Sequence, residues 1–303
     1  MVEIDADHEG QRLDNFLMTQ LKGVPRSRIY RIVRKGEVRI NKGRQKPDYK
    51  LQCGDKVRIP PIRVAARPAI NENADFQWLE QAVLHEDSKL MVLNKPTGLA
   101  VHGGSGVSLG LIEALRRLRP QCRFLELVHR LDRDTSGCLL VAKKRSILLA
   151  LHKALREGNI DKRYVALCRG GWQGKGQTVE APLLRYHLAN GERRVRVHSD
   201  GKPAKTRFSL RRSLKGAVLL DIKLFTGRTH QARVHAAHIN HPIAGDDKYG
   251  DKAFNQAMKK AGLKRMALHA ERLRFQHPGT NEWMMQTAPM PDEMNTIVET
   301  LAI

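Results

Sequence analysis

Residues 128–141 read VHRLDRDTSGCLLV, a loop dense in charge that runs directly into an apolar segment. The last four residues, Cys138–Val141, have the length of a buried strand, so the loop is expected at the rim of a sheet. Loops held there by a rigid scaffold often carry function. Three basic side chains around the carboxylates of Asp132 and Asp134 can keep an aspartate ionised in a partly buried site. The alternative is an ordinary turn that ends at Gly137.

Short apolar segments on both sides of this loop predict a mainly antiparallel α+β domain with flanking helices and loops. The predicted strands outnumber the predicted helices and come in consecutive groups, which is typical of α+β rather than alternating α/β proteins. The predicted strands are Leu90–Leu93, Cys138–Val141, Tyr164–Leu167, Arg194–Val197, Thr206–Leu210, Val218–Ile222 and Trp283–Gln286, and the predicted helices are Leu109–Arg119, Ser146–Glu157, Gln231–Ile239, Lys252–Ala261 and Asp292–Leu301.

A second polar segment, FTGRTHQARVH, occupies residues 225–235. Thr226 or Thr229 is expected to cap a helix that starts near His230, which leaves Arg228 beside free backbone amides at the start of that helix. Such a site suits an anion, either a phosphate or the carboxylate of the first loop.

The N-terminal part of the chain predicts a separate small domain over residues 1–70, followed by a linker over 71–80 and a larger domain over 81–303. Residues 1–70 hold 16 Lys and Arg against 8 Asp and Glu. An apolar stripe from Leu13 to Leu21 predicts one helix, and Ser27 is expected to cap a second. Short strands are expected at 38–40 and 57–59.

The net charge of the 303-residue chain is +23, from 54 Lys and Arg against 31 Asp and Glu. A protein so positive is expected to face a polyanion, which is nucleic acid or an anionic membrane. No run of 18 apolar residues exists, so a spanning helix is not expected. The acidic start at Met1–Asp5 lacks an apolar signal region, and the four cysteines lie far apart, which favours the reducing cytoplasm.

The small domain resembles the RNA-binding domain named after ribosomal protein S-four, over roughly residues 10–65. The resemblance rests on Arg12-Leu13-Asp14-Asn15-Phe16-Leu17, Ser27-x-Ile29, Gly36-Glu37-Val38-Arg39-Ile40-Asn41 and Gly54-Asp55-x-Val57. It implies a small α/β module that reads the shape of structured RNA. The phosphate contacts that it implies are Arg26, Arg28, Arg31, Arg34, Lys35 and Arg44.

The larger domain resembles the pseudouridine synthases that modify ribosomal and transfer RNA. Five motifs carry the resemblance: His129–Gly137, Thr226–His235, Asn94-Lys95-Pro96-x-Gly98, Lys162-x-Tyr164-x-Ala166 and Gly245-Asp246-x-x-Tyr249-Gly250. The resemblance implies an isomerase that converts specific uridines of 23S ribosomal RNA, free or in a pre-ribosomal particle, to pseudouridine. It also implies a monomer that needs no cofactor and no metal.

The resemblance assigns roles to four residues. Asp132 matches the catalytic aspartate that acts at the sugar of a uridine flipped out of its stack, as nucleophile or as base. Arg228 matches the arginine that pairs with this aspartate. Tyr164 matches the tyrosine that stacks on the base, and Arg130 matches a side chain that fills the vacated space. Ala232 departs from the Ile or Leu that is usual at its position, which predicts a looser pocket or a substitute elsewhere.

Three alternatives remain at this stage. His235 and His238 share a helix face at a spacing that suits a metal, although zinc needs three or four ligands. Asp132 and Asp134 are a possible pair of magnesium ligands in a phosphoryl transferase, which predicts inhibition by a chelator. A non-catalytic RNA-binding or ribosome-assembly factor predicts that Asp132→Asn is silent.

Overall fold

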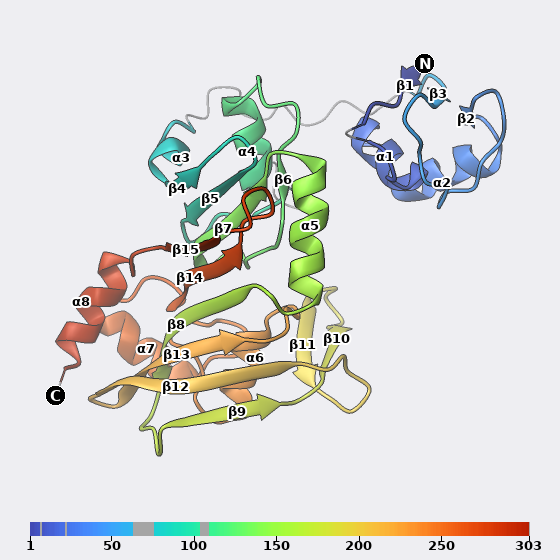
Figure 1. Ribbon diagram of the computed structural model, residues 1–303. Coiled ribbons are helices and arrows are strands. Elements are labelled where there is room, and N and C mark those ends of the chain that lie inside the picture. Colours follow the sequence, from blue (N-terminus) through green and yellow to red (C-terminus); the bar gives the residue numbers. More distant parts are fainter. Residues whose placement is uncertain (7, 22, 63–75, 104–108, 303) are drawn as a thin grey trace. The chain divides into compact units, whose positions relative to one another are not determined.

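The computed structural model describes residues 1–6, 8–21, 23–62, 76–103 and 109–302. The chain divides into two compact units, one built mainly from Met1–Ala74 and the other from Asp75 onward (Figure 1). Within the residues described, no helix is both long and apolar enough to cross a membrane, and Cys53, Cys122, Cys138 and Cys168 are free thiols.

The small domain packs two helices on a short antiparallel sheet. Helices α1 (Leu13–Gln20) and α2 (Arg26–Arg34) bury apolar stripes against strands in the order β1-β3-β2. The strands are β1 (Val2–Glu3), β2 (Arg39–Ile40) and β3 (Lys56–Arg58). The core residues are Ile4, Leu13, Phe16, Leu17, Ile29, Ile32, Val33, Val38, Ile40, Leu51 and Val57. Two of the three strands and both helices are those that the sequence predicts.

The predicted cap of α2 is wrong by two residues. Pro25, not Ser27, occupies the N-cap position, and its carbonyl accepts from the backbone N–H groups of Arg28 at 2.9 Å and Ile29 at 3.2 Å. Proline starts a helix well because its ring fixes φ near the helical value and the N–H that it lacks has no helical acceptor there.

The predicted linker over 71–80 is only partly within the described residues. Residues 71–75 lie outside them. Residues 78–80 belong to the short helix α3 (Trp78–Gln81), whose Leu79 is buried in the core of the larger domain. This end of the segment is therefore a packed part of that domain.

The larger domain is built on one mainly antiparallel sheet, as the sequence predicts. Its strands run in the order β4-β5-β7-β14-β8-β13-β12-β9, with β6 paired to β7 and β15 paired to β14. All pairs are antiparallel except that between β7 and β14. The strands are β4 (Val83–Glu86), β5 (Leu90–Lys95), β6 (Glu126–Leu127), β7 (Ser136–Ala142), β8 (Asp161–Arg169), β9 (Gly176–Glu180), β12 (Lys205–Leu214), β13 (Ala217–Leu224), β14 (Leu268–Gln276) and β15 (Trp283–Thr287). Strands β10 (Leu183–His187) and β11 (Arg193–Val197) form a separate hairpin.

Helices cover both faces of this sheet. Alternate residues of each strand point to opposite faces. One face packs against α3, α4 (Leu111–Leu118) and α6 (Gln231–His238), and the other against α5 (Arg145–Arg156), α7 (Lys252–Lys260) and α8 (Asp292–Thr300). The five helices predicted for this domain correspond to α4, α5, α6, α7 and α8. Each predicted end lies within two residues of the observed end.

The loop at 128–135 enters the sheet at its centre because β7 and β14 meet there. Ser136 pairs with His269 and Gly137 with Ala270. Gly137 has a φ of +109°, and a Cβ at this position would lie 2.2 Å from the carbonyl oxygen of Ala270. Only glycine allows the two strands to approach so closely, so this residue fixes where the charged loop emerges.

Candidate active site

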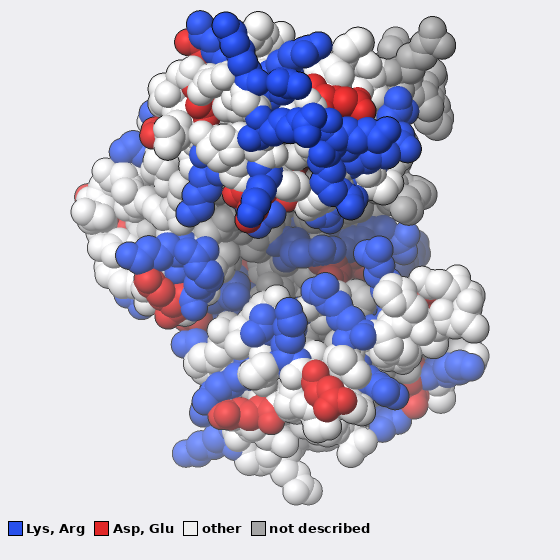
Figure 2. Space-filling model, turned by 90° about the vertical axis from the view of Figure 1, so that its right-hand side faces the viewer, with Lys and Arg blue, Asp and Glu red and all other residues white. Residues whose placement is uncertain are grey.

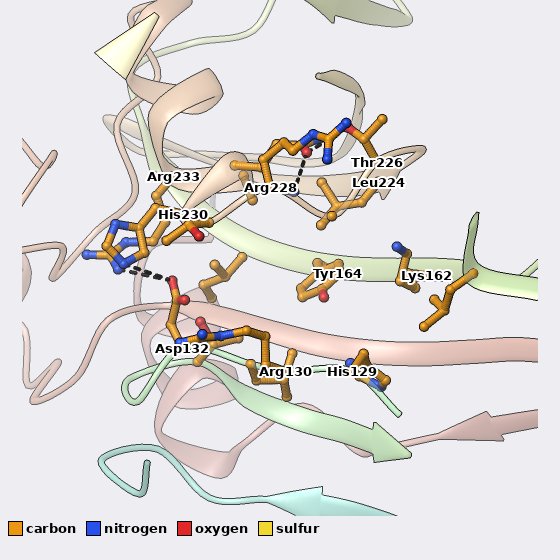
Figure 3. A pocket seen from close by; sticks show the side chains of 18 of the residues that line it. His129, Arg130, Asp132, Lys162, Tyr164, Leu224, Thr226, Arg228, His230 and Arg233 are labelled. Atoms are coloured by element: carbon orange, nitrogen blue, oxygen red, sulfur yellow. Dashed lines mark hydrogen bonds and ion pairs between the residues drawn. The ribbon is translucent and has the colours of Figure 1, made fainter. Parts of the chain in front are cut away.

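A cavity of about 490 Å³ opens beside the charged loop. Its walls come mainly from the loop at 128–135, strand β8 and the segment formed by the loop at 224–230 and the start of α6 (Figure 3), with further residues from α5, β10 and β14. The residues that the resemblance singles out, namely Arg130, Asp132, Tyr164, Arg228 and Ala232, all line it. The fold therefore assembles motifs from both halves of the larger domain around one space.

Asp132 is held by an arginine that is itself clamped by a buried carboxylate. Arg233 Nη1 donates to Asp132 Oδ2 at 3.1 Å. Its Nε and Nη2 donate to the two carboxylate oxygens of Asp246, each at 2.7 Å. Arg233 is 5% exposed and Asp246 is 1% exposed, whereas the Asp132 side chain is 20% exposed. The guanidinium is thus fixed from behind and presents one N–H to the carboxylate that faces the cavity.

The charges of this buried pair stabilise each other. Burial alone would raise the pKa of Asp246, but the hydrogen bonds and charge of Arg233 lower it below its usual value. Two backbone N–H groups, those of Lys248 and Tyr249, also donate to Asp246 Oδ1. Burial would lower the pKa of Arg233, and the two aspartates raise it instead. Both groups are therefore ionised around neutral pH.

The expected pairing of Arg228 with Asp132 is wrong. Arg228 Nε donates to the carbonyl of Pro203 at 3.0 Å, and Arg233 takes the place beside Asp132. The reason is local geometry: a residue in the left-handed conformation, His230 with a φ of 54°, separates the loop that carries Arg228 from the helix that carries Arg233. Arg228 still lines the cavity, on a wall across from Asp132 (Figure 3).

The expected threonine cap of α6 is also wrong, because His230 is the N-cap and makes no side-chain cap bond. Gln231 instead organises the loop. Its Oε1 accepts from the Thr226 hydroxyl at 2.7 Å and from the backbone N–H of Arg228 at 3.0 Å. Its Nε2 donates to Thr206 Oγ1 at 2.9 Å. These bonds fix the wall opposite the loop at 128–135.

His230 lies within reach of Asp132, with its Nε2 atom 3.9 Å from Oδ2. Its Nδ1 atom is hydrogen-bonded to the Tyr249 hydroxyl at 2.7 Å. Burial lowers the pKa of His230, and the charge of Asp132 only partly offsets this effect. The ring is therefore neutral around pH 7, and Arg233 is the permanent cation beside the aspartate. Sequence reasoning missed His230, Arg233 and Asp246 as site residues, although all three lie within motifs that it quoted.

Tyr164 projects from β8 into the middle of the cavity (Figure 3). The side chain is 8% exposed. Burial and then the negative charge of Asp132 raise the pKa of the Tyr164 hydroxyl. The phenol is therefore neutral at physiological pH, so it offers a flat apolar surface and a neutral hydroxyl rather than a phenolate.

A buried lysine holds the backbone of the loop at 128–135. Lys95 is fully buried, and its Nζ donates to the carbonyls of Pro96, Leu99 and Arg133 at 2.7, 2.7 and 2.9 Å. Burial lowers the pKa of Lys95 to about 7. Lys95 is the last residue of β5, and its bond to the carbonyl of Arg133 connects this strand to the residue that follows Asp132. This contact explains the lysine of the Asn94-Lys95-Pro96 motif.

The remaining site predictions divide as follows. Arg130 is an exposed residue of the cavity wall. Ala232 is 5% exposed and packs in the core beneath the cavity.

Asp134 pairs with Arg133 at 3.0 Å and not with Asp132. His235, considered as a metal ligand, uses both ring nitrogens, on Thr206 Oγ1 and the carbonyl of Ala181. The described ranges contain no group of three or more His, Cys, Asp or Glu that could hold a metal.

The six residues of the small domain expected to contact RNA are on its surface. Arg28, Arg31, Arg34 and Lys35 line one groove of α2, and Arg44 lines a second groove that shares Arg34. Arg26 is exposed at the start of the same helix. Figure 2 shows Lys and Arg side chains crowded over this domain, at the top of the view. Within the part of the chain that the structure describes, none of the six makes an ion pair.

Two family models match the chain. The RNA pseudouridylate synthase model covers residues 89–238 and the S4 domain model covers residues 11–57. The first match contains every residue that lines the cavity except Leu268, and the second contains both basic grooves.

Similar proteins match along nearly the whole length. The chain is 57% identical to ribosomal large subunit pseudouridine synthase C of Haemophilus ducreyi, over 98% of this chain and 94% of that protein. It is 56% identical to the protein of the same name in Escherichia coli (strain K12), over 99% and 96%. Among solved structures, human RNA pseudouridylate synthase domain containing 4 matches with a TM-score of 0.62 and 26% identity, over 74% of this chain and 94% of that one.

Proposed function

Since the chain belongs to the RNA pseudouridylate synthase family, we propose that the cavity isomerises a flipped uridine of large-subunit ribosomal RNA and that Asp132 performs the central step. The observation that carries this proposal is the Asp132–Arg233–Asp246 arrangement, which holds one carboxylate, ion-paired with a buried arginine, so that it faces a cavity large enough for a nucleotide.

The chemistry explains why one carboxylate is enough. The bond between C1′ of the ribose and N1 of uracil breaks, the base turns, and a bond from C1′ to C5 forms. C5 loses a proton and N1 gains one, so no atom is gained or lost overall. Positive charge develops at C1′ as the first bond breaks, and a carboxylate aimed at that carbon stabilises it, whether it bonds to the carbon or removes the proton of the neighbouring carbon.

The other cavity residues hold the nucleotide. Tyr164 stacks on the uracil, and Arg130 takes the space that the flipped base leaves in the RNA. Arg228, which is free of Asp132, binds a phosphate that flanks the target. The neutral state of Tyr164 is suited to stacking and to a hydrogen bond.

The small domain supplies affinity for the large RNA. When the unpaired basic side chains on α2 bind phosphates, the counterions bound to the RNA are released. The affinity that these side chains add therefore depends on salt concentration. The substrate proposed here, the RNA of the large ribosomal subunit, corresponds to the names of the similar proteins. Such a substrate implies that the protein acts in the cytoplasm.

The test is a map of pseudouridines in ribosomal RNA from cells that lack this protein, complemented with the wild type or with Asp132→Asn. We expect specific large-subunit positions to lose the modification in the deletion strain, to regain it with the wild type, and to stay unmodified with the variant. Identical maps in all strains would refute the proposal. In vitro, a chelator is expected to leave the conversion unchanged, whereas loss of activity would favour a metal-dependent enzyme.

A further inference from the structure

Lys162 is a buried cation in the catalytic cavity that the reaction described above does not use. It projects from β8, is 9% exposed and lines the cavity. Within the described residues, its Nζ makes no hydrogen bond and no ion pair, and the neighbouring carboxylate of Asp161 binds Arg163 Nε at 3.0 Å. Most of the side chain is covered, and the Nζ atom is reached by solvent through the cavity. A cation that the fold places on the wall of a cavity is available to a ligand that enters it.

The position of Lys162 is fixed relative to the two residues that define the substrate. Lys162 and Tyr164 are two residues apart on one strand, so both side chains project from the same face, about 7 Å apart along the strand. Figure 3 shows Asp132, Tyr164 and Lys162 in that order along the cavity. Gly227 on the opposite wall comes close to the amine, since a Cβ built there would lie 3.7 Å from Lys162 Nζ, in van der Waals contact, so the amine lies inside the cavity rather than at its rim.

We propose that Lys162 donates a hydrogen bond to the O4 carbonyl of the target uracil and stabilises the uracil anion that forms when the C1′–N1 bond breaks. This inference rests on the proposed function. With the ribose at Asp132 and the ring on Tyr164, the edge of the uracil farthest from the sugar faces Lys162. That edge carries O4.

The electron balance of the reaction requires such a group. When the C1′–N1 bond breaks, its electron pair stays with the uracil and spreads over N1 and the two carbonyl oxygens. An ammonium beside one of those oxygens favours the broken state over the intact uridine, which is how a preorganised charge accelerates a step. Lys162 only donates a hydrogen bond and keeps its protons. After the new C1′–C5 bond forms, the one proton that C5 loses is balanced by the one proton that N1 gains.

The same contact selects uracil over cytosine. Cytosine carries an amino group where uracil has O4, so the ammonium would meet a donor and both groups would be left unpaired. A buried site built to donate rejects an analogue that cannot accept. Lys162 therefore acts on both rate and base specificity.

The experiment measures single-turnover conversion of a large-subunit RNA transcript by wild type, Lys162→Met and Lys162→Arg. Lys153→Met is the matched control, since Lys153 is 70% exposed on α5 and outside the cavity. We expect Lys162→Met to lower the rate by about 10²-fold with little change in RNA affinity, and Lys162→Arg to recover most of it. Lys153→Met is expected to match the wild type.

A transcript that contains 5-fluorouridine separates stabilisation of the anion from other roles. Its C5 carries fluorine in place of the proton that the reaction removes, so pseudouridine cannot form, and the rate on this RNA is measured as breakage of the C1′–N1 bond, that is, as loss of intact 5-fluorouridine from the digested transcript. Fluorine withdraws electrons, so the fluorouracil anion needs less help, and we expect the deficit of Lys162→Met to shrink at least tenfold on this RNA. A deficit that is the same on both transcripts, or that is confined to RNA affinity as for a phosphate contact, would overturn the inference. Should Lys162→Met fail to fold, Lys162→Gln carries the same comparison. Failure of the wild type to convert uridine would instead refute the proposed function.

Discussion

Replacement of Arg233 by methionine is expected to damage stability and activity through two separate contacts. The change leaves Asp246, which is 1% exposed, without its cation, while two backbone N–H groups still bind one carboxylate oxygen. Removal of one partner of a buried ion pair costs about 3–5 kcal/mol. Because the backbone bonds remain, we expect a loss of about 3 kcal/mol in the unfolding free energy at pH 7.

The pH dependence follows from the two pKa shifts of Asp246. In the wild type its pKa is lowered, so the stability that it contributes is present above the unfolded value and is lost as pH falls through the folded value. In Arg233→Met only the two backbone N–H groups oppose the effect of burial, so we expect the pKa of Asp246 to be raised and stability to be lost as pH rises through that raised value. The difference between the two proteins should therefore shrink as pH falls from 7 to about 5.

Denaturation followed by tryptophan fluorescence measures this difference, since Trp78, Trp172 and Trp283 all belong to the larger domain. The double variant Arg233→Met with Asp246→Leu replaces the ion pair by apolar residues, and we expect it to recover most of the stability. It should still convert no uridine, because Asp132 has lost its cation. A double variant that is as unstable as the single one, or that regains activity, would refute this reasoning.

Three further predictions concern other parts of the chain. Tyr164→Phe should convert uridine within about tenfold of the wild-type rate in a single-turnover assay, since it loses one neutral hydroxyl, and complete loss would contradict a stacking role. Gly137→Ala should lower the unfolding free energy, measured with denaturant, by about 3 kcal/mol, because its Cβ would lie 2.2 Å from a backbone oxygen. Gly158→Ala is the control and should cost less, since a Cβ there has nothing within 4 Å. Equal losses in the two variants would be inconsistent with a clash at the strand junction. Arg28→Ala and Arg31→Ala should each lower the salt dependence of RNA binding by about one in the log–log slope, and unchanged slopes would remove the groove from the RNA interface.

The sequence predicts the general architecture well because strands and helices leave period-two and helical patterns. The main omission is β14 at the centre of the sheet. Its second half, Arg272–Gln276, alternates buried Leu273 and Phe275 with exposed residues, which is a period-two signal. Its first half, Leu268–Ala270, is buried throughout and interrupted by a bulge before Arg272, so no single pattern spans the strand.

The site could be predicted as a set of motifs but not as a set of contacts. Arg228 and Arg233 lie five residues apart in one motif, and no pattern of residue types says which of them faces Asp132. The choice depends on the left-handed backbone of His230 and on the clamp from Asp246, which the fold brings to Arg233. Pairing across such a distance is decided by tertiary structure.

The most direct test of the role proposed for Asp132 is single-turnover conversion of the RNA transcript by purified Asp132→Asn, with RNA affinity measured in parallel. The exchange removes the charge and keeps the shape of the side chain. We predict that the variant binds the transcript as the wild type does and forms no detectable pseudouridine. Formation of pseudouridine at a rate near that of the wild type would contradict the assignment of the reaction to Asp132.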